Sequence, residues 1–260
     1  MRLLSYTGLA GGILLALGLT GCVTQPTGST GQQAIARSLA SAKVHTELAA
    51  MYYERTQLGV ALEEVAKALR AEPNYAPAYS VRGLVQMALH EDQQAEEDFQ
   101  HSLKLDGSDS GTHNNYGWFL CQRGKEHDSI KQFMEALKNP LYATPEKSYV
   151  NAGVCSRKGG NAKDAEAFLQ KALILKPNMP EALLALADMN FANGDYAGAK
   201  SYFIRFSQNS DPSSLTAENL WLAVRIERKL SDKNSEESYA LQLRKRFPES
   251  RETLLMLQGQ

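Results

Sequence analysis

The side chains best suited to metal binding or catalysis in this 260-residue chain belong to three cysteines and five histidines. Thiolates and imidazoles bind metal ions or act as nucleophiles and bases, but they need partners at defined spacings. No His-x-x-x-His or Cys-x-x-Cys pair occurs in the sequence. The histidines stand singly, as His45, His90, His101, His113 and His127. We therefore expect no metal site, no cofactor and no enzymatic activity.

Charge excludes a further class of function. The chain has 28 Lys and Arg against 29 Asp and Glu, and the basic residues form no stripe. A nucleic-acid-binding protein would show such a basic footprint, so no nucleic-acid partner is expected. No strand is expected either, and a phosphate-binding glycine loop would have to follow one.

Cys22 stands directly after an apolar segment that begins behind Arg2 and extends from Leu3 to Leu19. Glycines and polar residues interrupt this segment, which makes it marginal as a transmembrane helix of about 20 residues. We expect residues 1–21 to be a secretory signal peptide. The segment ends in Leu19-Thr20-Gly21-Cys22, which resembles the bacterial lipobox. The alternative is an ordinary secretory signal followed by an incidental cysteine.

The lipobox resemblance implies that the Cys22 thiol is lipidated, with palmitate among its acyl chains, and that the chain is cut before it. Val23 rather than Asp follows the cysteine. By resemblance to lipoprotein sorting, this implies lipid anchoring at the periplasmic face of the bacterial outer membrane. Residues 22–40 are small and polar at their start and show no apolar period, so we expect a flexible tether there.

Residues 41–250 repeat with a period of about 34, which is the tetratricopeptide repeat (TPR) length. Small residues recur at one place in each predicted first helix, as at Gly83, Gly117 and Gly153, and large aromatic residues recur in the second helices, as at Phe99 and Phe133. One helix pair cannot bury its own apolar face, so successive units must stack. We expect an all-α, right-handed superhelix (solenoid) of six TPR units, followed by a capping helix over residues 251–260.

Cys121 and Cys155 lie near the ends of the predicted first helices of the third and fourth units. First helices of successive units pack side by side, and an exported protein meets an oxidising compartment. We expect a disulfide between the two residues, and the alternative is two buried free thiols that act as small apolar fillers.

The inner wall of such a superhelix is built from first helices and is the expected partner-binding groove. Apolar side chains there would receive side chains of a bound peptide, and amide side chains would pair with its backbone. The alternative is that Trp118 and Met87 only pack between neighbouring units. The predicted groove residues are Leu84, Met87, Asn114, Asn115, Trp118, Val150, Asn151, Val154 and Phe191.

The whole chain resembles the PilF/PilW family of type IV pilus biogenesis lipoproteins. The resemblance rests on the lipobox, the short polar tether, the six repeats and the stretches NNYGWFLCQRGKEHDSIKQFMEAL and NAGVC. It implies a pilotin that binds the secretin of the pilus machinery and promotes its outer-membrane localisation and multimerisation, and hence twitching motility. The alternative is a TPR lipoprotein that acts as a scaffold or regulator of cell-envelope (peptidoglycan) enzymes.

Overall fold

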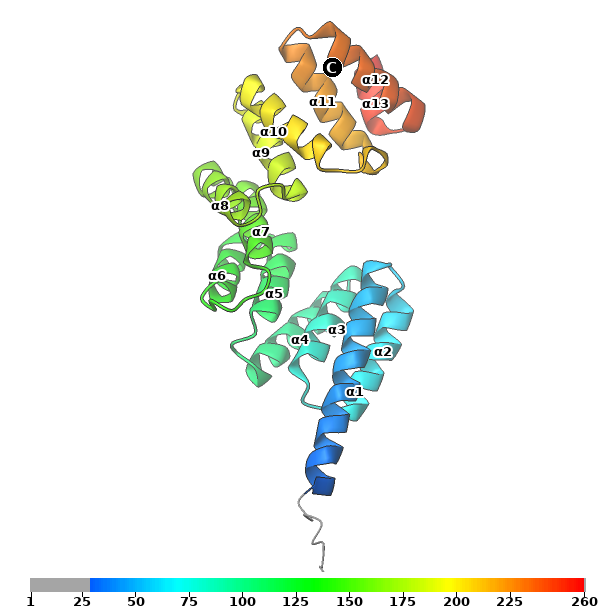
Figure 1. Cartoon of the computed structure of the whole chain (residues 1–260), viewed down its shortest axis with the longest axis vertical. Coiled ribbons are helices and arrows are strands. Elements are labelled where there is room, and N and C mark those ends of the chain that lie inside the picture. Colours follow the sequence, from blue (N-terminus) through cyan, green and yellow to red (C-terminus); the bar gives the residue numbers. More distant parts are fainter. Residues whose placement is uncertain (1–28, 260) are drawn as a thin grey trace, which may run out of the picture.

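The computed structural model describes residues 29–259, and the segment over 1–21, Cys22 and Val23 lie outside this range. Between residues 29 and 259 the chain forms only helices and their connections (Figure 1). The helices are α1(Ser29–Glu54), α2(Leu58–Ala71), α3(Ala76–Ala88), α4(Asp92–Leu105), α5(Ser110–Gln122), α6(Glu126–Ala136), α7(Pro145–Lys158), α8(Ala162–Leu175), α9(Pro180–Ala192), α10(Tyr196–Gln208), η1(Pro212–Ser214), α11(Ala217–Lys229), α12(Lys233–Arg246) and α13(Arg251–Leu257).

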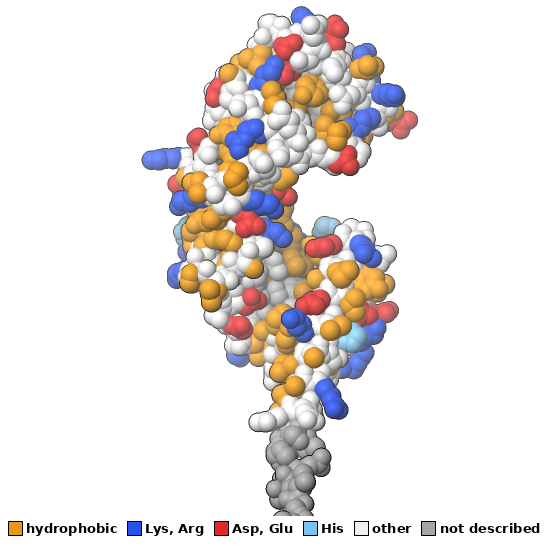
Figure 2. All heavy atoms as spheres, in the orientation of Figure 1, with side chains coloured by type: hydrophobic (Ala, Val, Ile, Leu, Met, Phe, Trp, Pro, Cys, Tyr) orange, Lys and Arg blue, Asp and Glu red, His pale blue; other side chains and the backbone are white. Residues whose placement is uncertain are grey.

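The twelve helices α1 to α12 pack as six consecutive pairs, each joined by a short turn. Each first helix also contacts the first helix of the next unit, from α1–α3 to α9–α11. The pairs stack into the predicted all-α TPR solenoid, which curves so that the units at the two ends approach one another across an open side (Figure 1). The space-filling view shows this side as a hollow between the upper and lower parts of the molecule (Figure 2).

Small residues in the first helices allow the paired helices to approach closely. A Cβ atom added to Gly83 would lie 3.0 Å from the Phe99 ring, and one added to Gly117 would lie 2.7 Å from the Phe133 ring. Both rings are fully buried. The repeated small residues in the sequence therefore mark the places where a large side chain of the second helix packs directly against the backbone of the first helix.

The turn within each unit has three residues, and its middle residue has a positive φ in all six units. Glycine adopts this conformation at no steric cost and occupies the position in the third, fourth and fifth units, as Gly124, Gly160 and Gly194. Other residue types hold the same conformation in the remaining units, as Thr56, His90 and Ser231. The packing of the flanking helices therefore fixes the turn even where the residue type disfavours it.

The tether prediction is wrong for residues 29–40, because α1 begins at Ser29. These residues include strong helix formers and no proline, and they continue a helix whose later turns are packed against α2 and α3. The early part of α1 projects beyond α2 (Figure 1), and its side chains from 31 to 37 are exposed. Packing of one end thus extends a helix into a segment that lacks an apolar period.

The largest buried cluster joins the fourth, fifth and sixth units and extends from Val150 to Leu243. Two smaller clusters lie around Phe99 and around Phe133. Helix α13, in the predicted capping segment, packs against α11 and α12 and follows the last unit. In the described part of the chain, no helix combines the length and apolarity that a membrane span requires.

Candidate partner-binding surface

The predicted apolar groove residues lie on the first helices, and all except Val150 are half-buried. Leu84 and Met87 pack against the cluster around Phe99, and Trp118 packs against the cluster around Phe133. Val154 and Phe191 pack against the large C-terminal cluster. These side chains therefore contribute to the packing of the core while part of each remains accessible, and their role in binding stays a prediction.

Val150 is a correction to the predicted groove. Its side chain is only 5% exposed and belongs to the same buried cluster as Leu169 and Leu183. A valine side chain ends close to its own helix, where neighbouring helices enclose it. Val150 is therefore a core residue, unavailable to a partner.

The predicted amide residues form a hydrogen-bonded network across three units. Asn115 Nδ2 donates to Ser80 Oγ over 3.3 Å, and Asn114 Nδ2 donates to Asn115 Oδ1 over 3.4 Å. Asn114 Oδ1 accepts from Ser148 Oγ at 2.9 Å and from Asn151 Nδ2 at 3.0 Å. The network links α3, α5 and α7, so these amides hold the units in register, and their contact with a partner stays a prediction.

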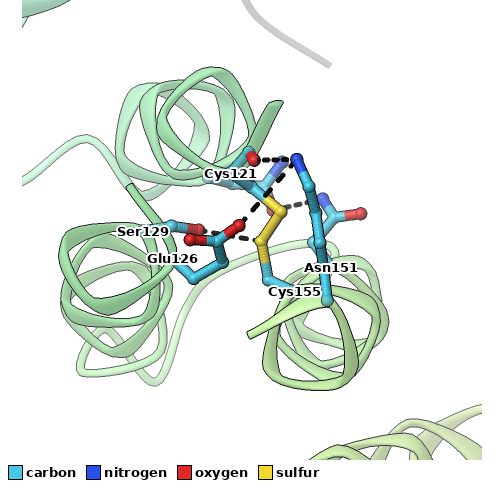
Figure 3. The surroundings of a disulfide bond; sticks show 7 residues. Cys121, Glu126, Ser129, Asn151 and Cys155 are labelled. Carbon is cyan, nitrogen blue, oxygen red and sulfur yellow. Dashed lines mark hydrogen bonds and ion pairs between the residues drawn. A yellow bond between two sulfur atoms is a disulfide. The ribbon is translucent and has the colours of Figure 1, made fainter. Parts of the chain in front are cut away.

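Cys121 of α5 and Cys155 of α7 are joined by a disulfide that ties the third unit to the fourth (Figure 3). Their Cα atoms lie 5.8 Å apart, and both residues are fully buried. Ser129 Oγ lies 3.2 Å from Cys155 Sγ, and Lys158 Nζ donates to the Cys121 carbonyl oxygen over 2.6 Å. The bond fixes the joint between two first helices of the predicted groove.

A cavity on the inner wall lies further toward the C-terminus than the predicted centre at Trp118. This cavity of about 640 Å³ is formed by α9, α11 and α13, with Arg157 at the end of α7. Its apolar lining consists of Leu184, Ala185, Trp221, Leu222 and Leu255. Its charged lining consists of Arg157, Glu181, Asp188, Glu218, Arg225, Arg251 and Glu252.

Two guanidinium groups and one carboxylate meet at one part of this cavity. Asp188 forms an ion pair with Arg157 and lies 3.9 Å from Arg225 Nη2. The Arg225 guanidinium carbon lies 4.6 Å from the ring centre of Phe191 and 5.8 Å from that of Trp221, which are cation–π distances. The buried Arg225 Nε atom has no hydrogen-bond partner. The rings therefore hold a cation in place while its hydrogen-bonding capacity is only partly used.

Carboxylates gather at the other end of the cavity, in the first turns of three helices. Glu181, Glu218 and Glu252 each lie in the first turn of α9, α11 and α13, respectively. A hydrogen bond from the Thr216 side chain and one from the backbone hold the pKa of Glu218 below its ordinary value. The cavity thus has an acidic end and a basic part.

The predicted groove does not include Trp221, Arg225 and Leu255, because groove residues are predicted only in the first five units. Trp221 and Arg225 occupy in α11 the places that Leu184 and Asp188 occupy in α9. The repeat register is therefore the signal that identifies them. Leu255 occupies the same fifth position in α13, 34 residues after Trp221, so the repeat register identifies it as well.

The geometry defines a TPR solenoid with a hollowed inner wall, which is a non-enzymatic protein-interaction fold. The tetratricopeptide repeat family matches residues 157–206. Type IV pilus assembly protein PilF of Pseudomonas aeruginosa is 28% identical over 239 residues, which are 92% of this chain and 93% of PilF. An uncharacterised protein of Haemophilus influenzae is 27% identical over 135 residues, which are 52% of this chain and 72% of that protein.

Solved structures agree with these relatives. The crystal structure of PilW, a widely conserved type IV pilus biogenesis factor, has a TM-score of 0.74 and 31% identity, and the match covers 83% of this chain and 98% of PilW. The structure of Pseudomonas aeruginosa PilF has a TM-score of 0.75 and 25% identity, and the match covers 85% of this chain and 98% of the PilF chain. The chain belongs to the PilF/PilW family of type IV pilus biogenesis proteins.

Proposed function

We propose that this protein is an outer-membrane lipoprotein that acts as a pilotin. In this function it binds the secretin of the type IV pilus machinery and promotes its localisation and multimerisation in the outer membrane. The observation that carries the proposal is the match to PilW and PilF over 98% of their structures, because it covers 83% and 85% of this chain and so far exceeds one generic TPR pair. The lipobox at Leu19 to Cys22 supports the lipid anchor.

The inner wall supports binding to a protein. It offers half-buried apolar side chains, among them Trp118 and Val154, beside amide groups. Truncation of a tryptophan at the centre of an interface costs about 2 kcal/mol or more in binding. We place the secretin contact on this wall, around Trp118, Asn114 and Asn115.

The double change Asn115→Ala and Trp118→Ala tests this site in cells that carry type IV pili. We expect the secretin to remain monomeric and twitching motility to fall, while the thermal unfolding curve measured by circular dichroism stays near that of the unchanged protein. Gln122→Ala is the matched control, because this residue lies on the same helix and is exposed. Normal secretin multimers with a stable double variant would remove Trp118 from the site.

Deletion of the whole protein tests the function itself. We expect surface pili and secretin multimers to be lost. Altered cell shape or antibiotic sensitivity with pili intact would instead indicate a regulator of peptidoglycan enzymes.

A further inference from the structure

The cavity between α9, α11 and α13 presents opposite charges at a fixed separation. Glu218 and Arg225 both line it, and they lie seven residues apart on α11. With a rise of about 1.5 Å per residue, their Cα atoms are separated by about 10 Å along the helix. A peptide in the polyproline II conformation has three residues per turn and rises about 3.1 Å per residue, so its side chains three positions apart lie on the same face about 9 Å apart.

The basic part of the cavity has a surplus positive charge. Arg157 and Arg225 share the single carboxylate of Asp188, and Arg157 holds the closer contact. Phe191 restrains the Arg225 guanidinium from one side, and the Arg225 Nη2 atom lies 3.9 Å from Asp188 Oδ1, which is beyond hydrogen-bond distance. A planar guanidinium with unused donors is suited to a carboxylate, which accepts two parallel hydrogen bonds.

The acidic end has a surplus negative charge. Glu181, Glu218 and Glu252 face only one lining cation there, Arg251. Glu218 lies in the first turn of α11, where the partly positive end of the helix favours the carboxylate form. A basic side chain of a partner would restore the balance at this end.

Apolar surface lies among these charges. Leu184 of α9, Trp221 and Leu222 of α11, and Leu255 of α13 line the cavity. Mixed charge of this kind disfavours a nucleic acid, which needs a uniformly basic surface. It matches a polypeptide segment with charges at its ends and apolar side chains between them.

We infer that this cavity binds a protein segment in the polyproline II conformation, in which an acidic and a basic side chain stand three positions apart and flank apolar residues. The acidic side chain contacts Arg225 and the basic side chain contacts Glu218. The inference rests on the proposed function only in that the partner is a protein. The contact that it assigns lies on the same inner wall but is separate from the one around Trp118.

Synthetic peptides test the inference without the secretin. The probes are acetyl-GSDLFKSG-amide, the reversed-charge order acetyl-GSKLFDSG-amide and the neutral acetyl-GSNLFQSG-amide. The chain has two tryptophans, and the protein used in this assay carries Trp118→Phe. The fluorescence emission of Trp221 then reports binding in the cavity. We expect one charged order to bind about tenfold or more tightly than the neutral peptide.

Charge reversal in the protein makes the test specific. Arg225→Glu should weaken the preferred peptide by about tenfold or more, and Glu218→Lys combined with Arg225→Glu should shift the preference to the opposite order. Lys43→Glu, an exposed change on α1, is the matched control and should leave binding unchanged. Arg225→Gln replaces Arg225→Glu if the latter fails to give a native circular-dichroism melt.

Equal binding of the charged and neutral peptides, or unchanged binding in a folded Arg225 variant, would overturn the inference. Neither outcome would alter secretin multimerisation in cells, which is the readout of the proposed function. Conversely, a loss of pilotin activity in the Trp118 variant would leave the peptide preference of the cavity intact. The two ideas can therefore fail separately.

Discussion

Replacement of Gly153 by alanine tests how the helix pairs of this solenoid are held together. Gly153 lies inside α7, where it faces Leu169 of α8. An added Cβ atom would lie 2.6 Å from Leu169 Cγ and 3.1 Å from the carbonyl oxygen of Ala165. We expect the variant to be less stable, even though alanine is the better helix former.

The expected magnitude is the difference between two opposing effects. Glycine to alanine inside a helix gains about 1 kcal/mol from helix propensity. Leu169 is fully buried and would have to withdraw from 2.6 Å to at least the 3.4 Å of ordinary contact. Overpacking of a filled core costs about 1–3 kcal/mol, and the contact with Ala165 involves backbone, which places the cost near the upper end. The net loss is therefore about 1–2 kcal/mol.

Thermal unfolding followed by circular dichroism measures this loss. For a chain of this size, about 1–2 kcal/mol corresponds to a fall in Tm of about 2–8 °C. Gly59→Ala is the matched control, because nothing lies within 4 Å of an added Cβ atom at that exposed helical position. It should be neutral or should stabilise by up to about 1 kcal/mol.

A double-mutant cycle separates the steric effect from other causes. Leu169→Ala alone should cost about 2–5 kcal/mol, because it opens a cavity in the core. In the double variant with Gly153→Ala, the new methyl group enters that space, so the two changes should be less than additive by about 1 kcal/mol or more. A Gly153→Ala protein as stable as the unchanged one, or strictly additive losses, would refute the close-approach explanation.

The remaining predictions concern the anchor, the disulfide and one ion pair. Cys22→Ser should abolish labelling with a palmitate analogue and outer-membrane fractionation, and normal membrane partitioning would contradict lipidation at this residue, which lies outside the described range. The denatured, unreduced periplasmic domain without Cys22 should show no alkylatable thiol until reduction releases Cys121 and Cys155, and two thiols before reduction would disprove the bridge. Closure of the 34-residue separation predicts a stabilisation of about 4 kcal/mol, measured by unfolding with and without reductant. Asp232→Asn should lower stability at pH 7. The hydrogen bond from Lys200, followed by those from Ser235, lowers the pKa of the Asp232 carboxyl, so its stabilising contribution is present above the ordinary Asp pKa of about 3.9 and is lost as the pH falls through the lowered value. The free energies of unfolding of the two proteins should therefore converge as the pH falls below the ordinary Asp pKa, and a difference that stays constant during acidification would contradict the assignment.

The solenoid and its unit boundaries could be predicted from the sequence because repeat packing is local. Each unit repeats the same small and large residues at about 34-residue intervals, and each contacts only its neighbours. The period alone therefore specifies which helices pair and in what order. The same register placed Cys121 and Cys155 on adjacent first helices, where the structure joins them.

The start of α1 and the burial of Val150 depended on the tertiary structure. Residues 29–40 have the polar composition of a linker, yet they continue a helix whose far end is packed. Val150 has the register of a groove residue, yet neighbouring helices cover its short side chain. Sequence composition and repeat register predict the position of a residue within its repeat unit, but they do not predict how completely neighbouring helices bury it.

The sequence by itself determined the repeat architecture, and the export signal and the groove residues stay predictions from it. Only the tertiary structure decided where the inner wall is hollow. The cavity forms where α13 packs against α11, so that Leu255 lines the same hollow as Trp221 and as Leu184 of α9. Its charges come from helices separated by a full repeat or more, as with Arg157 and Arg225, whose shared contact with Asp188 depends on the curvature of the stack. Curvature is the sum of small rotations between successive units, and no single stretch of sequence encodes that sum.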